Sequence, residues 1–336
     1  MNIAQIGLRL RAQMEEFLGN LPAGKTTRRF ALEALYGIAS RGSLKLSEIA
    51  RSLNEPIALI KTENRLSRQA ARPHLDEVLR DHVIAQGAAR IGRDTLLIVD
   101  PSDIAKPYAE KMEYLARVRD GSKKELADGY WLCQVVGVDR GGQGLVPLVN
   151  HLWSQRAPGF KSENHEVLAC MVAVMRQVGE RGVWVMDRGG DRMKLFAPLL
   201  RWRRRFVIRL RGDRTLLQGQ TPLLARTIAA QCPLPYAECV RRHNADGTET
   251  TLSLEFGFRP VRLPGHERAL HLLVVKGFGQ EPLMLLTTEP LRQKRAVLWA
   301  AVEAYLTRWR IEETLRCASP SRLTSWRTCG CWATRA

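Results

Sequence analysis

Two short apolar segments, each ending in an aspartate, constrain the fold of this chain more than any other feature. Residues 95–100 read TLLIVD and residues 182–187 read GVWVMD. A short apolar run bounded by turn residues is typical of a strand that is buried on both faces of a sheet. The two segments therefore predict an α/β sheet in which two strands end in Asp100 and Asp187.

The segments around these strands continue the pattern. Residues 130–139 and 145–154 are apolar runs on either side of a Gly-rich turn, which is typical of a β-hairpin. Residues 164–179 and 194–205 have helical periodicity, and residues 206–211 form another apolar run. The order strand, hairpin, helix, strand, helix, strand predicts an α/β layered domain.

The rest of the chain has a different composition. Residues 101–129 are basic and predict a mobile loop, whereas residues 213–290 lack helical periodicity and predict β-structure. Residues 291–315 have the period of one long helix. Roughly the first 85 residues predict helices, including a helix–turn–helix whose last helix begins near residue 58.

That last helix has a basic polar face. The side chains that share the face are Lys61, Asn64, Arg65 and Arg68. They predict contact with DNA, and the alternative is a small helical bundle with a solvated charged face. The net charge favours DNA, because 52 Lys and Arg against 34 Asp and Glu leave +18, and such a charge attracts polyanions.

The same positive charge makes an anionic membrane surface the second candidate partner. The alternative is a soluble protein that is basic without binding a polyanion. No segment reaches the roughly 18 uninterrupted apolar residues of a membrane span, and the start of the chain lacks a signal-peptide apolar block. The sequence thus predicts a cytoplasmic, nucleoid-associated protein with no membrane partner. Cys329 and Cys331 lack further ligands at zinc spacing, so no zinc site is expected.

The strand-end aspartates favour a metal site. The carboxyl ends of neighbouring parallel strands meet at one sheet edge, and two carboxylates placed there repel each other unless a cation lies between them. Oxygen ligands favour Mg²⁺ or Mn²⁺ over zinc. The alternative is that each acid only ends its strand. A third acid, Glu312, lies on one helical stripe with Tyr305 and Arg308, although Arg308 and Glu312 also have the spacing of an intrahelical ion pair.

These residues resemble the signature of one enzyme family. Asp100 after an apolar strand, Asp187 in VMDRGGDR, and the spacing Tyr305-x-x-Arg308-x-x-x-Glu312 are similar to the DDE triad and the Y-R-E part of the Y-R-E-K signature. That signature belongs to transposases of the insertion-sequence-four group. The Y-R-E spacing is the most specific part of the resemblance.

The resemblance implies a fold. It covers about residues 25–316 and implies an α/β, ribonuclease-H-like catalytic core with a helical DNA-binding region before it and a β-rich insertion within it. The expected segments are the DNA-binding region at 1–90, the first part of the core at 91–212, the insertion at 213–290, the catalytic helix at 291–316 and an aberrant tail at 317–336.

The resemblance also implies a chemistry. Asp100, Asp187 and Glu312 would hold two Mg²⁺ ions, for which Mn²⁺ can substitute, while Tyr305 and Arg308 would position phosphates. Water would nick the element end, and the freed 3′-OH would then attack target DNA. The expected partners are double-stranded DNA, as element ends and target, and a second copy of the chain on paired ends.

The end of the chain departs from the family pattern. The signature's Lys should lie seven residues after Glu312, where this sequence has Ser319. Back-translation of residues 325–334 with GC-rich codons and a shifted frame gives L-E-D-V-R-V-L-G-Y, so we interpret the tail as a frameshift that truncates the catalytic helix. Two alternatives to an active transposase therefore remain: a non-catalytic DNA-binding protein from a decayed copy, and another ribonuclease-H-like nuclease.

Overall fold

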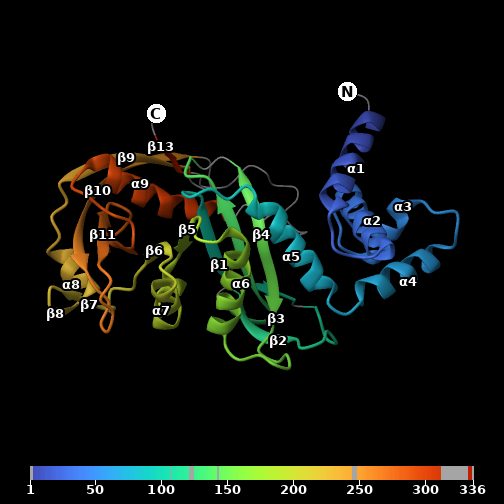
Figure 1. Cartoon of the computed structure of the whole chain (residues 1–336), viewed down its shortest axis with the longest axis horizontal. Coiled ribbons are helices and arrows are strands. Elements are labelled where there is room, and N and C mark those ends of the chain that lie inside the picture. The colour runs from blue at the N-terminus through green and yellow to red at the C-terminus, as the bar shows by residue number, and fades with distance from the viewer. Residues whose placement is uncertain are drawn as a thin grey trace. The chain divides into compact units, whose positions relative to one another are not determined.

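The computed structural model describes residues 3–106, 108–120, 125–141, 144–243, 248–311 and 332–334. Two compact units make up the chain (Figure 1). Within the described residues, the first unit covers 3–86, and the second covers 87–311 together with 332–334. Each unit is a separate structural body, and the second contains the large sheet.

The first unit is helical, as predicted. Its helices are α1 (Ile3–Gly19), α2 (Lys25–Arg41), α3 (Leu46–Leu53), α4 (Leu59–Ala70) and most of α5 (Leu75–Ala88). Phe30, Ile49 and Leu66 form the centre of the core between α2, α3 and α4. Gly37 allows α2 and α3 to pack closely, because a Cβ at this position would lie 2.6 Å from Cγ2 of Ile49.

The second unit is built on a large mixed sheet. Its strands are β1 (Leu96–Ala105), β2 (Ala116–Asp120), β3 (Glu125–Val138), β4 (Leu145–Trp153), β5 (Val183–Met186), β6 (Arg205–Arg209), β9 (Tyr236–His243), β10 (Glu249–Val261), β11 (Leu270–Lys276), β12 (Leu283–Thr287) and β13 (Trp332–Thr334). Among the described residues their order is β13-β9-β10-β11-β12-β6-β5-β1-β3-β2, with β4 also paired to β3.

The centre of this sheet is parallel, and both sides are antiparallel. β5 pairs in parallel with β1 and with β6, whereas β3 pairs antiparallel with β1 and with β4. Strands β9 to β12 continue from β6 as an antiparallel meander. The predicted β-structure of residues 213–290 thus extends the same sheet, and a small hairpin of β7 (Thr215–Gln218) and β8 (Thr221–Leu224) lies off it.

Helices cover both faces of the sheet. α9 (Arg295–Leu306) shares one apolar core with Ile98, Val185 and Val207. On the other face, α7 (Met193–Arg201) places Phe196 against Phe206, the residue that alternates with Val207 along β6. Helix α6 (Glu163–Val178) packs on β3 and β4. The result is a three-layer α/β/α arrangement (Figure 1).

The sequence-based expectations were wrong at three places. The segment predicted as a loop contains the second half of β1, which continues past Asp100 to Ala105 because its pairing with β3 continues, and it also contains strand β2, which pairs with β3. The segment predicted to lack helices contains α8 (Ala225–Ala230). The long helix predicted over 291–315 begins at Arg295 and is interrupted after Leu306 by a 3₁₀ turn over Thr307–Arg310, beyond which Ile311 is again α-helical. Residues 312–315 of that prediction lie outside the described residues. The Thr307 hydroxyl donates to the carbonyl of Glu303 at 2.8 Å, a bond that competes with regular helix geometry.

Among the described residues, no helix combines the length and the apolar character needed to cross a bilayer.

Candidate active site

Strand pairing places Asp100 beside Asp187. The parallel register of β1 and β5 pairs Val99 with Met186. The next residue along β1 is Asp100, and the first residue after β5 is Asp187. Neighbouring strands lie about 4.8 Å apart. The two carboxylates, which are 87 positions apart in the sequence, are therefore brought together at the end of β5.

The same pairing puts both aspartates on one face of the sheet. Leu96 and Ile98 on β1, and Val183 and Val185 on β5, belong to the core beneath α9. Side chains alternate along a strand, so Asp100 and Asp187 continue these two rows on the α9 side. The backbone at Asp187 is still extended (φ −76°, ψ −166°), which keeps the alternation valid one residue beyond β5.

The residues that follow α9 reach Asp100. Arg308 lies in the 3₁₀ turn, and its Nη1 is 3.8 Å from Oδ1 of Asp100. Its side chain is 11% exposed, and its guanidinium carbon is 5.7 Å from the ring centroid of Tyr305, which is itself buried. Within the described chain the buried Nε of Arg308 has no hydrogen-bond partner. The structure thus brings Asp100, Asp187, Tyr305 and Arg308 into one region, and Glu312 lies outside the described residues.

The atoms of Asp100 and Asp187 that could bind a metal ion at this site are oxygen atoms. Gln134 is the register partner of Asp100 on β3, and its side chain lies on the same face, where Nε2 is 3.4 Å from Oδ1 of Asn150. Cys133 projects to the opposite face. The pKa of its thiol is raised well above the usual value by a hydrogen bond with Cys170, by burial and by the nearby Asp100 carboxylate. Because Cys133 projects to the face opposite Asp100 and Asp187, the two aspartates offer carboxylate oxygens as ligands on the α9 side.

The loop after β5 holds Asp187 in place through its glycines. The backbone N–H of Gly189 donates to Oδ1 of Asp187 at 2.7 Å. A Cβ at Gly189 would lie 2.9 Å from that same oxygen, and a Cβ at Gly190 would lie 2.6 Å from Cβ of Met186. The Gly-Gly pair in VMDRGGDR therefore allows the chain to turn tightly behind the carboxylate.

Sequence reasoning overlooked Asp191, the second acid of that motif. Its side chain is 1% exposed, and its Oδ1 accepts from Nε of Arg214 at 2.6 Å. Its Oδ2 accepts from the backbone N–H of Arg211 at 2.7 Å. Asp191 thus ties the loop that follows Asp187 to the segment that follows β6. The repeated acid in DRGGDR was the available signal, but its partner is 23 residues away in the sequence.

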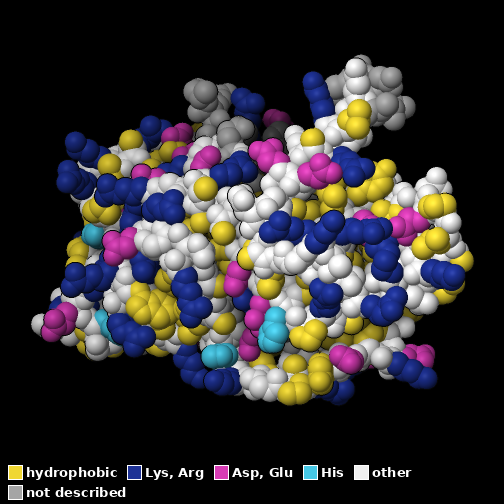
Figure 2. All heavy atoms as spheres, turned by 45° about the vertical axis from the view of Figure 1, so that its right-hand side comes forward, with side chains coloured by type: hydrophobic (Ala, Val, Ile, Leu, Met, Phe, Trp, Pro, Cys, Tyr) yellow, Lys and Arg dark blue, Asp and Glu magenta, His cyan; other side chains and the backbone are white. Residues whose placement is uncertain are grey.

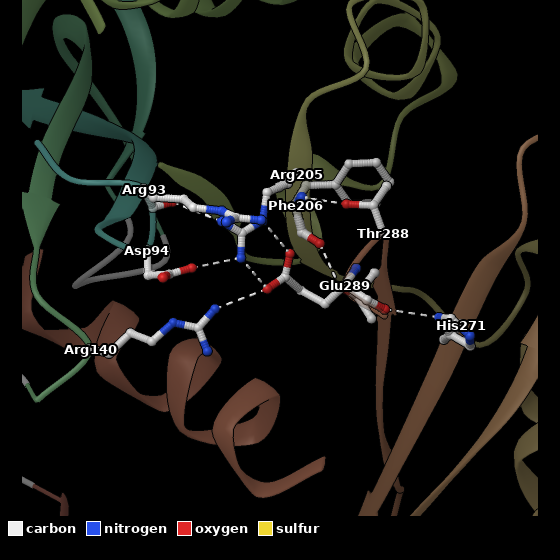
Figure 3. A network of polar contacts seen from close by, with 9 residues as sticks. Arg93, Asp94, Arg140, Arg205, Phe206, His271, Thr288 and Glu289 are labelled. Atoms are coloured by element: carbon white, nitrogen blue, oxygen red, sulfur yellow. Dashed lines mark hydrogen bonds and ion pairs between the residues drawn. The ribbon is translucent and has the colours of Figure 1, made fainter. Parts of the chain in front are cut away.

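A second charged network lies at the opposite end of the central strands (Figure 3). Arg205, at the start of β6, donates to both carboxylate oxygens of Glu289, at 2.8 and 2.7 Å, and to Asp94 at 2.9 Å. Arg140 donates to Glu289 at 2.9 Å, and the Glu289 carbonyl is 2.9 Å from Nδ1 of His271. The Arg205 hydrogen bond lowers the pKa of Asp94. Because its charges are paired, this network fastens the meander to the central strands.

The predicted DNA-binding residues of α4 fall into two classes. Lys61 and Arg68 are exposed. Arg65 instead donates to Glu33 at 2.5 Å and to Glu55 at 2.9 Å, so its guanidinium joins α4 to α2 and to the turn before α4. Lys and Arg side chains are spread over much of the face in Figure 2, in keeping with the net charge.

The Glu55 carboxylate takes part in several of these bonds. It accepts from the Thr62 hydroxyl at 2.7 Å as well as from Arg65, and its other oxygen accepts from Arg29 at 2.9 Å. The hydrogen bond from Thr62, followed by that from Arg65, lowers the pKa of Glu55. Arg65 is therefore part of the framework that holds the first unit together.

No protein-family model matches the sequence, and no curated protein matches it. Among solved structures, the chain is structurally similar to the piggyBac transposase in its synaptic complex with hairpin DNA, with a TM-score of 0.46 and 13% sequence identity. The similarity covers 95% of this chain and 65% of the other, so this chain spans about two thirds of the transposase chain that it resembles.

Proposed function

We propose that this chain is a DDE-type transposase of the insertion-sequence-four group, which cleaves DNA at element ends and joins the freed ends to target DNA. The observation that carries the proposal is the register of β1 and β5, which places Asp100 and Asp187 side by side on the face covered by α9. The Arg308 contact with Asp100 supports it, because a cation next to the carboxylates can hold a DNA phosphate.

The strand arrangement supports a ribonuclease-H-like core. In the order β4-β3-β1-β5-β6 the strands β1, β5 and β6 are parallel and β3 is antiparallel to β1. This follows the predicted order of strand, hairpin, helix, strand, helix and strand. The meander and α9 come next along the chain, where the family carries its insertion and its catalytic helix.

The residues at the site suit a divalent cation with hard oxygen ligands. Mg²⁺, or Mn²⁺ in its place, would supply activation of the attacking oxygen and stabilisation of the leaving 3′ oxygen. Asp100 and Asp187 would hold it, and Arg308, supported by Tyr305, would orient the phosphate. The described residues contain no group of three His, Cys, Asp or Glu side chains close enough to bind an ion. The proposal therefore requires a further ligand, and Glu312 is the residue we assign to it.

The test is a cleavage assay with three variants. Purified protein is incubated with Mg²⁺ or Mn²⁺ and a supercoiled plasmid that carries the DNA flanking the gene. We expect nicking that is abolished in Asp100→Asn and Asp187→Asn, with DNA binding retained. Asp139→Asn is the matched control, because Asp139 is exposed and lies at the opposite end of β3. Calorimetric titration with Mn²⁺ should show binding that the first two variants lose and the control keeps.

The tail gives the assay a second informative outcome. If the wild-type chain binds DNA but nicks nothing with either ion, the alternative function applies, namely a non-catalytic DNA-binding protein derived from a decayed transposase. A variant whose tail is encoded in the alternative reading frame and has a Lys at position 319 would then be expected to recover nicking. Nicking that survives Asp100→Asn would contradict the assignment of the site.

A further inference from the structure

Exposed apolar side chains gather at the start of α4. Ile57, in the turn before the helix, is 50% exposed, and Ile60, in its first turn, is 59% exposed. The helix has a separate face for its own packing, where Thr62 and Leu66 are 2% and 0% exposed. The exposed isoleucines are therefore not part of the core of the first unit and are accessible to a partner.

Polar side chains continue the same stripe along α4. Asn64 and Arg68 follow Ile60 at intervals of four residues, and Lys61 lies next to Ile60 and three residues before Asn64. All of them are exposed. The stripe thus combines an apolar group, an amide and two cations. Arg65 is excluded from it, because its guanidinium is paired with Glu33 and Glu55.

The helices have the layout of a DNA reader. α3 and α4 are joined by a short turn that begins at Asn54, whose φ of 46° is the left-handed conformation that asparagine tolerates. In a helix–turn–helix, the residues near the start of the second helix face the base edges in the major groove. Ile60, Lys61 and Asn64 occupy those positions in α4.

We propose that the first unit reads DNA sequence through Ile60 and Asn64, which select a site containing A·T pairs. An apolar side chain recognises the thymine C5 methyl group, and an asparagine amide hydrogen bonds in bidentate fashion with N6 and N7 of adenine. Lys61 and Arg68 contact the phosphates on either side of the groove. The inference rests on the proposed function only in taking double-stranded DNA as the partner.

The charges on the stripe argue for DNA as the occupant rather than a second copy of the chain. Two copies facing each other through this stripe would bring Lys61 and Arg68 of one copy against those of the other, and like charges repel. The net charge of +18 gives the same preference for a polyanion.

The experiment is a binding selection followed by single-atom changes in the DNA. The full-length protein is incubated with random-sequence duplexes without divalent metal, and the bound fraction is sequenced. We expect an enriched site with A·T pairs. In that site, replacing one thymine by deoxyuracil removes only the methyl group, and replacing one adenine by 7-deazaadenine removes only N7.

Each base change should weaken DNA binding by the wild-type protein. It should not weaken binding by the variant that lacks the side chain proposed to contact that base. Ile60→Ala should bind the thymine and deoxyuracil duplexes equally, and Asn64→Ala should bind the adenine and 7-deazaadenine duplexes equally. Asn64→Ala should lose discrimination at its position by roughly 5- to 150-fold at most, the range for a complete bidentate pair. Ile60→Ala should lose roughly fourfold, the effect of one buried methyl group. Ile60→Val should keep the methyl preference. Leu8→Ala is the matched control, because Leu8 is 70% exposed on α1 and lies off the stripe.

Three outcomes would overturn the inference. These are a selection that enriches no sequence, variants that both keep the wild-type base preferences, and an Ile60→Ala variant that changes from dimer to monomer in light scattering with its base preference unchanged. Because the selection involves no cleavage, its result is independent of the nicking assay. A specific site without nicking would support this inference and contradict the catalytic proposal, and nicking without a specific site would do the reverse.

Discussion

Removing the Asp191 carboxylate should destabilise the second unit and impair the candidate active site. The side chain is 1% exposed, and its partner Arg214 is 22% exposed, so Asp191→Ala leaves a largely buried guanidinium without its carboxylate. Breaking a buried ion pair from one side costs about 3–5 kcal/mol. Because Arg214 keeps some solvent contact, we expect the lower end, about 3 kcal/mol. In a domain of about 150–250 residues this lowers Tm by about 6–12 °C.

The assay is thermal unfolding followed by circular dichroism, combined with the plasmid nicking assay. Asp191→Ala should also reduce nicking, because the loop that carries Asp187 loses its anchor to the segment after β6. Asp191→Asn should cost less, since it retains an acceptor for the Arg211 backbone N–H. Asp213→Asn, an exposed acid nearby, is the control.

A double-mutant cycle tests whether the pair itself carries the effect. Arg214→Met removes the cation, so the combination of Asp191→Ala with Arg214→Met should be less destabilising than the sum of the two single changes. A Tm for Asp191→Ala within about 2 °C of wild type would refute the reasoning. Strictly additive effects in the cycle would refute it as well.

Three further outcomes are expected. Gly190→Ala should lower the free energy of unfolding by about 1–3 kcal/mol in denaturant titrations and reduce nicking, because its Cβ would lie 2.6 Å from a β5 side chain. Lys61→Ala should reduce the log-log salt slope of DNA binding by about 0.9, whereas Arg65→Met should leave the slope unchanged and lower Tm. The pKa values of Asp94 and Glu55 are lowered in the fold, so their stabilisation is present above the unfolded pKa of about 4 and is lost as pH falls through the folded values. Tm should therefore drop in acid. It should drop less steeply in the double variant that combines Asp94→Asn with Glu55→Gln.

Much of the fold could be predicted because its signals are local. The apolar runs at β1 and β5, the hairpin of β3 and β4, and helices α3 and α6 each have a periodicity that a short window of sequence contains. Strand β2 was missed because its burial depends on pairing with β3, which a basic segment does not indicate by itself. The interruption after α9 was missed because periodicity does not record local side-chain bonds such as that of the Thr307 hydroxyl, which bonds back to the helix.

The candidate site also has residues that the sequence predicts and contacts that it does not predict. Asp100 and Asp187 could be singled out because each follows an apolar run in the sequence, and Tyr305 and Arg308 because of their helical spacing. Three features could not be found: the anchoring of the Asp187 loop by Arg214, the structural pairing of Arg65, and the network around Glu289. In each of them the partners come from elements distant in the chain.

The amino-acid order alone thus specifies which acids follow a buried apolar run, which residues lie together on a helix and what charge the chain presents to a partner, since all three depend on neighbours along the chain or on totals. Which carboxylates stand side by side, and which cations are neutralised by ion pairs, was decided by strand register and packing. A shift of one residue between β1 and β5 would turn Asp187 to the opposite face from Asp100, because side chains alternate along a strand. That register is set by burial of the apolar rows on both faces, a property of the assembled sheet.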